Sequence, residues 1–133
     1  MDLVADAVPR FRVVNAVLCR DGLQVSVIIV ADLEAAARLG GSLGMLPKGG
    51  VDDAIGEKDL SGLLRDNTYE VLNVLSAVFN VENAPHVRLY EMYGPNDAVP
   101  GDVAGLAYAV GGRMDVVLSI AGYGDGRLAV IVK

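Results

Sequence analysis

The order of apolar and polar positions predicts strands at both ends of this chain and helices in its middle. Two runs rich in valine and isoleucine, residues 11–19 and 23–30, flank Asp21-Gly22, a pair that favours a tight hairpin turn. The second run is too continuously apolar for a strand with one wet face. We therefore expect a β-hairpin whose second strand is covered on both faces.

Two segments have helical spacing. Asp32 is the expected N-cap of a first helix that ends near Gly44 and carries small residues, which would allow close packing. The second, residues 59–80, is predicted as the longest uninterrupted helix, with a broad apolar face at three- and four-residue spacing. That face comprises Leu60, Leu63, Leu64, Val71, Leu72, Val74, Leu75, Val78 and Phe79. Between the two helices, the glycine-rich residues 45–56 are expected to form a loop.

Four further strands are predicted after the long helix, at residues 87–92, 103–110, 114–121 and 127–132. Glycine-rich turns separate the last three, which we expect to form an antiparallel meander. Helices and strands are thus segregated along the chain. The prediction is an α+β fold of two layers, with a mostly antiparallel sheet and two long helices on one face, in a single domain over residues 1–133.

Composition and charge exclude several classes of partner and cofactor. The chain of 133 residues is 53% hydrophobic and has a net charge of −6 without a basic run, which argues against nucleic acid and anionic membranes as partners. Its one cysteine, Cys19, lies in an apolar run and is expected in the core, and a reducing, cytoplasmic location follows. His86 has no second histidine or nucleophile pattern beside it, and Asp52 and Asp53 lack a cation-binding spacing, so no metal or cofactor of the chain's own is expected.

A narrow polar stripe on the long helix is the remaining candidate site. Asp66, Glu70, Asn73, Ala77 and Asn80 follow one another at steps of four, three, four and three residues and so share one side. A carboxamide such as that of Asn73 can donate to and accept from a water without adding negative charge. On spacing alone, however, the simpler interpretation is that Asp66, Glu70 and Asn73 are solvated side chains on the exposed face of an amphipathic helix.

The stripe resembles the hallmark of the CheC/CheX/FliY chemotaxis phosphatases. In that family an acid or serine is followed four residues later by Glu and three further on by Asn, as at Asp66, Glu70 and Asn73. A downstream proline belongs to the pattern, and Pro95 lies nearest its place, with two competing prolines at 85 and 100. The resemblance covers roughly residues 18–80 well. Within the family, the chain is most similar to a short, single-site CheX-like domain.

The resemblance implies a phosphatase that removes the aspartyl phosphate of a response-regulator receiver similar to CheY. It implies that Asn73 aligns a water and that Glu70 grips a lysine of the receiver, which supplies its own Mg²⁺. Asp66, Ala77 and Asn80 are then expected to bind the partner, Ala77 by allowing close approach. The resemblance also implies a homodimer.

The alternative is a non-catalytic CheX-like module that docks on a signalling partner or serves for dimerisation. It is motivated by the reduced N-terminal helix, compared with that family, and by a possible exposed sheet edge.

Overall fold

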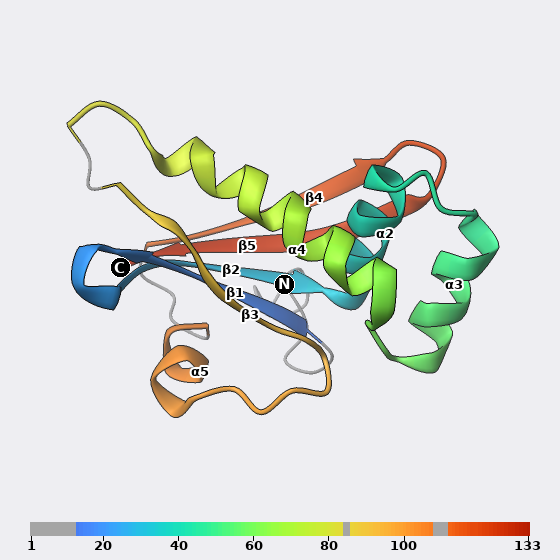
Figure 1. Cartoon of the computed structure of the whole chain (residues 1–133), viewed down its shortest axis with the longest axis horizontal. Coiled ribbons are helices and arrows are strands. Elements are labelled where there is room, and N and C mark those ends of the chain that lie inside the picture. Colours follow the sequence, from blue (N-terminus) through green and yellow to red (C-terminus); the bar gives the residue numbers. More distant parts are fainter. Residues whose placement is uncertain (1–12, 84–85, 108–111) are drawn as a thin grey trace, which may run out of the picture.

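The predicted strands form one antiparallel sheet in the computed structural model, which describes residues 13–83, 86–107 and 112–133 (Figure 1). Residues 11 and 12, the start of the first predicted strand, lie outside these ranges, as do Pro85 and residues 108–111. The elements, in chain order, are β1 (Val13–Arg20), η1 (Asp21–Leu23), β2 (Gln24–Asp32), α2 (Leu33–Leu43), α3 (Lys48–Glu57), α4 (Gly62–Ser76), η2 (Ala77–Phe79), β3 (Arg88–Tyr93), α5 (Gly101–Ala107), β4 (Arg113–Ile120) and β5 (Gly124–Val132).

Within the described residues, the sheet has five strands in the order β3-β1-β2-β5-β4. Each neighbouring pair is antiparallel. β2 is therefore central, and residues 27–32 of it are buried, which confirms the expectation of a strand covered on both faces. β3 and β4 form the two edges.

Alternate residues of the strands point to opposite faces of the sheet and contribute to two apolar core clusters. On one face, Val14, Ala16 and Leu18 of β1 belong to a core cluster that also contains residues of α2, α3 and α4. On the other face, Val17 and Cys19 of β1 cluster with residues of α5. The α+β class with two long helices, α2 and α4, on one face of the sheet is confirmed, and α5 adds a short helix to the opposite face (Figure 1).

Small residues let α2 lie close to its neighbours, as the sequence predicted. A Cβ atom added at Gly40 would come within 2.9 Å of the Leu64 carbonyl oxygen and of the Thr68 backbone nitrogen on α4. Across the same contact, the Thr68 hydroxyl donates to the Ala36 carbonyl oxygen at 2.9 Å. The two helices therefore approach at backbone distance, which a larger residue at Gly40 would prevent.

The predicted loop at residues 45–56 was wrong, because most of it forms α3. Glycine has low helix propensity, but tertiary packing overrides it here: Val51 is 1% exposed in the main core. An ion pair between Lys48 and Asp52, 2.7 Å long and one turn apart, adds local support. Asp52 is thus engaged within the helix.

The strand predicted at residues 103–110 was also wrong. Residues 101–107 form α5, whose Val103 and Ala107 pack on the sheet, and residues 108–110 lie outside the described part. The three-stranded meander therefore reduces to the β4–β5 hairpin. β3, which corresponds to the strand predicted at residues 87–92, pairs with β1 at the far edge of the sheet.

Candidate functional site

α4 presents the predicted polar stripe to solvent. The helix turns Thr68, Leu72 and Ser76 toward the core, and all three are buried. On the opposite side, the structure places Asp66, Glu70, Asn73 and Ala77 together, and all four are exposed. The stripe therefore lies on a helix whose inner face is fixed by packing, as positioned functional groups require.

The helix is shorter than predicted. α4 ends at Ser76, and Ala77–Phe79 continue as a tighter 3-10 turn, so Ala77 lies at the junction of the two elements. Asn80 follows this turn and is half-buried. Its amide nitrogen donates to the Val87 carbonyl oxygen at 3.0 Å, and its amide oxygen accepts from the Val87 N–H at 2.7 Å. Asn80 thus holds the chain at the entrance to β3, and its expected contact with a partner stays a prediction.

The beginning of α4 is tied to the loop that carries Pro95. Arg65, in the first turns of the helix, forms an ion pair of 2.6 Å with Asp97. The Asp97 carboxylate also accepts from the Gly94 N–H at 2.7 Å. The Arg65 hydrogen bond, followed by that of Gly94, lowers the pKa of the Asp97 carboxyl. The loop containing Pro95 is therefore held at the Asp66 end of the stripe; Pro100 instead directly precedes α5.

Three aliphatic side chains, two on α4 and one on the 3-10 turn η2 that follows it, were wrongly placed in the core by the sequence pattern. Leu63, Val74 and Val78 are 62%, 63% and 66% exposed. Val74 follows Glu70 by four residues, so it lies one turn along the same side of the helix. The predicted apolar face was too wide for all of its side chains to be buried against one layer. That width was the feature of the sequence that could have indicated exposed aliphatic residues.

The other candidate residues have plainer surroundings. Cys19 is 3% exposed, and burial raises the pKa of its thiol, which fits the predicted core role. His86 is exposed at the entrance to β3. Among the described residues, no group of three His, Cys, Asp or Glu side chains could hold a metal ion. In the same part of the chain, no helix is both long and apolar enough to cross a membrane.

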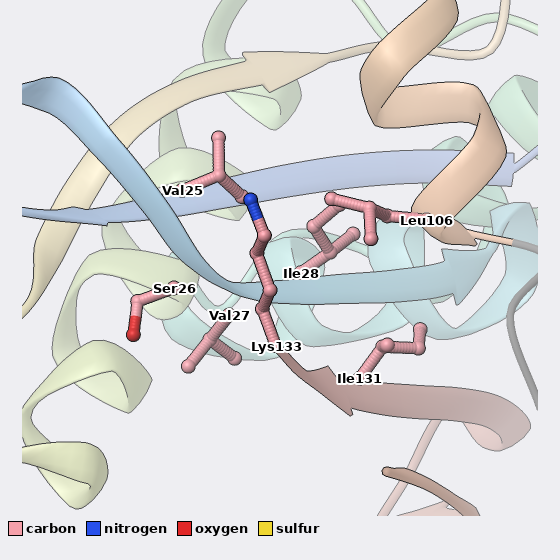
Figure 2. Close-up of a pocket in the computed structure, with 7 residues that line it drawn as sticks. All are labelled: Val25, Ser26, Val27, Ile28, Leu106, Ile131 and Lys133. Atoms are coloured by element: carbon pink, nitrogen blue, oxygen red, sulfur yellow. The ribbon is translucent and has the colours of Figure 1, made fainter. Parts of the chain in front are cut away.

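A shallow apolar pocket lies away from the stripe, on the α5 side of the sheet. Figure 2 shows the aliphatic stem of Lys133 reaching across it toward Val25, with Leu106 of α5 and Ile131 of β5 on the far side. It leaves no room for even a water-sized molecule, so it does not form a site for a small ligand. The stripe, by contrast, is a convex surface suited to a macromolecular partner.

Comparisons with known proteins do not assign the chain to a family. No family model, no curated protein and no solved structure matches it.

Proposed function

We propose that the chain hydrolyses the aspartyl phosphate of a response-regulator receiver domain, using the stripe on α4. The observation that supports this is the common exposure of Asp66, Glu70 and Asn73 along one side of a helix anchored by its buried face. An acyl phosphate is already reactive, so a catalyst need only hold a water in line with the phosphorus atom. Side chains on a rigid helix meet that need.

Asn73 would orient the water, and Glu70, one turn earlier, would pair with a lysine of the receiver. Attack by the water oxygen on phosphorus breaks the bond to the receiver's aspartate oxygen, releasing the free carboxylate and inorganic phosphate. A neutral amide at Asn73 avoids repulsion with the phosphoryl oxygens, which an aspartate would create. The receiver carries its own magnesium ion, in keeping with the family that the stripe resembles.

Phosphate release from a panel of phosphorylated receivers tests the proposal. We expect Asn73→Ala and Asn73→Asp to lower the rate by about 100-fold, because the attacking water loses its alignment. Glu70→Gln should weaken turnover through the lost charge, while Glu57→Gln, an equivalent change at an exposed position on α3, should not. An Asn73→Ala protein as active as the parent would exclude the assigned role.

A non-catalytic docking module is the second candidate, favoured by the exposed aliphatic side chains beside the stripe. It predicts that the chain binds a receiver or another signalling partner without releasing phosphate. Turnover that depends on Glu70 and Asn73 would rule it out.

We also propose a homodimer that pairs the β4 strands of two copies. In the part of the chain that the structure describes, β4 is an edge strand, and its Met114 and Val117 are 62% and 69% exposed. Unpaired edges of this kind invite strand addition, and a two-fold axis would let two β4 strands run antiparallel. Light scattering at micromolar concentration should give twice the monomer mass, and Val117→Lys should reduce it to the monomer. A monomeric parent protein would contradict the proposal.

A further inference from the structure

The first turn of α4 is weakly defined by its own sequence. Its N-cap, Ser61, makes no capping hydrogen bond with its side chain within the described ranges, and Gly62 has a φ of +59°. The turn also carries Arg65 instead of an acid, so its charge opposes the helix dipole. Because these local signals for a helix start are missing, contacts from elsewhere in the chain have to fix where α4 begins.

The loop at residues 94–97, between β3 and α5, supplies such contacts, and we call it the clasp loop. One carboxylate oxygen of Asp97, Oδ2, accepts from Nη2 of Arg65 at 2.6 Å and from the Gly94 N–H at 2.7 Å. The Asp97 N–H in turn donates to the Gly94 carbonyl oxygen at 3.2 Å, which closes the loop on itself. The carboxylate is therefore held by its own loop where it offsets the charge of Arg65.

The clasp loop also holds the segment that enters α4. The Asn96 amide nitrogen donates to the Lys58 carbonyl oxygen at 3.1 Å and to a carboxylate oxygen of Asp59 at 3.4 Å. Lys58 is the C-cap of α3 and has a left-handed backbone conformation. The clasp loop thus contacts the end of α3, the linker and the first turn of α4, which lie 32 to 38 residues away in sequence.

The ion pair alone would contribute little. The side chains of Arg65 and Asp97 are 34% and 37% exposed, and an isolated pair at that exposure is screened by solvent. Here, however, Asp97 is already held by Gly94, and the loop is held by Asn96. Little further conformational freedom is therefore lost when Arg65 binds, so the whole set of contacts stabilises the start of α4 more than the pair would.

Beyond its first turns, α4 is held independently of the clasp loop. The Thr68 hydroxyl donates to the Ala36 carbonyl oxygen of α2 at 2.9 Å. Farther along the helix, Leu72 and Ser76 are buried. The clasp loop therefore acts on the residues ahead of Thr68, which include Asp66, and leaves the later part of the stripe to the packing of α4.

We propose that the clasp loop is a positioning device: through Asp97 and Asn96 it fixes the first turns of α4 and so the Asp66 end of the stripe. Its consequence for turnover rests on the proposed function. Loosening the loop displaces Asp66, which precedes the anchor at Thr68, and leaves Asn73, which follows that anchor, in place. The expected result is a change in KM without an equal change in kcat.

Hydrogen exchange of the full chain tests the clasp without any partner. Asp97→Ala removes the acceptor for both Arg65 and Gly94. We expect the backbone amides of Arg65 and Asp66 to exchange about fivefold faster than in the parent, because the first turns of α4 open more often. The amide of Leu72 should keep its exchange rate within about twofold, since burial protects it.

Two further variants show whether the effect passes through the clasp contacts. Asp52→Ala removes an ion pair of 2.7 Å with Lys48 inside α3 and should leave the exchange of the α4 amides unchanged. Arg65→Met keeps the aliphatic stem and removes the donors. Combined with Asp97→Ala, it should accelerate exchange by less than the product of the two single effects, because both substitutions break the same contact.

Kinetics with a receiver that the parent dephosphorylates tests the positioning role. Asp97→Ala should raise KM about threefold and leave kcat within about twofold, because Asp66 is displaced and Asn73 is not. Asp97→Asn keeps an acceptor oxygen for the Gly94 N–H and should restore most of the parent KM. A loop that contributed only to global stability would lower the melting temperature of Asp97→Ala without changing KM.

The outcomes separate the clasp from the proposed function. If Asp97→Ala leaves the exchange of Arg65 and Asp66 unchanged, the inference is wrong whatever the turnover. If exchange accelerates and KM stays at the parent value, the loop stabilises α4 without positioning the stripe, and the inference is again overturned. If the parent dephosphorylates no receiver, the proposed function fails, and the exchange rates still decide whether the clasp loop fixes the start of α4.

Discussion

The two long helices on the same face of the sheet use their residues in opposite ways. α2 buries Leu33, Gly40, Gly41 and three consecutive alanines, and its small residues bring it to backbone distance from α4. α4 buries only Thr68, Leu72 and Ser76 and leaves most of its outer side in solvent. Packing therefore accounts for the sequence of α2 almost position by position.

Packing does not explain the residues on the outer side of α4 in the same way. Packing does not require Asn73 at an exposed position, nor exposed valines at 74 and 78. An amphipathic helix that served only as a cover would normally carry solvated side chains there. α2 is thus an internal helix that supports α4, and α4 exposes its outer side to solvent. It follows that substitutions on α2 should act on stability and those on the outer side of α4 on binding or turnover.

The largest effect on stability is expected at the contact between the two helices. Gly40→Val would place side-chain atoms against the Leu64 carbonyl and the Thr68 backbone nitrogen, where even a Cβ has no room. We expect the free energy of unfolding to fall by about 3 kcal/mol, the upper part of the range for overpacking a core. Urea denaturation followed by circular dichroism measures it.

Gly56→Val on α3 is the matched control for this change. A Cβ at Gly56 meets no heavy atom within 4 Å, so its effect should stay within about 0.5 kcal/mol. If both substitutions lowered the free energy of unfolding equally, the close contact of α2 with α4 would not be what makes Gly40 necessary.

Much of the fold could be predicted because its signals are local. The N-cap at Asp32, the hairpin of β1 and β2 and the small face of α2 each depend on residues close together in sequence. The errors have the opposite origin. α3 contains three glycines and is stabilised by burial of Val51, a contact that local propensity cannot register. Likewise, no local signal indicated that β3 would pair with β1, which lies about 70 residues earlier in the chain.

For the candidate site, the sequence located the stripe but not its surroundings. Helical periodicity was enough to align Glu70 with Asn73, and the structure places them as expected. Periodicity could not tell which side of the apolar face would lack a covering layer, so Val74 and Val78 were wrongly assigned to the core. The pairing of Arg65 with Asp97 joins residues 32 apart in sequence, and only the folded chain brings them together.

A smaller effect on stability is expected at the start of α2, where Asp32 is the N-cap. Asp32 is 7% exposed, and its carboxylate accepts from the N–H groups of Ala35, at 2.8 Å, and Arg127, at 3.1 Å. It caps α2 and links the helix to β5. Asp32→Ala should lower the free energy of unfolding by about 1–2 kcal/mol, because the cap is lost and two N–H groups lose their acceptor. Asp32→Asn keeps an acceptor oxygen and should lose much less.

The pH dependence separates the charge of Asp32 from its role as an acceptor. Burial raises the pKa of the Asp32 carboxyl, and this outweighs the two backbone hydrogen bonds that lower it. A raised pKa in the folded state means that the contribution of Asp32 is greatest below its unfolded pKa of about 4 and decreases as the pH rises through the folded value. The stability of the parent relative to Asp32→Asn should therefore fall as the pH is raised above about 4, measured by thermal melts at each pH. A difference that grew with pH would mean that the ionised carboxylate itself stabilises the cap, and that α2 is held by charge as well as by close packing.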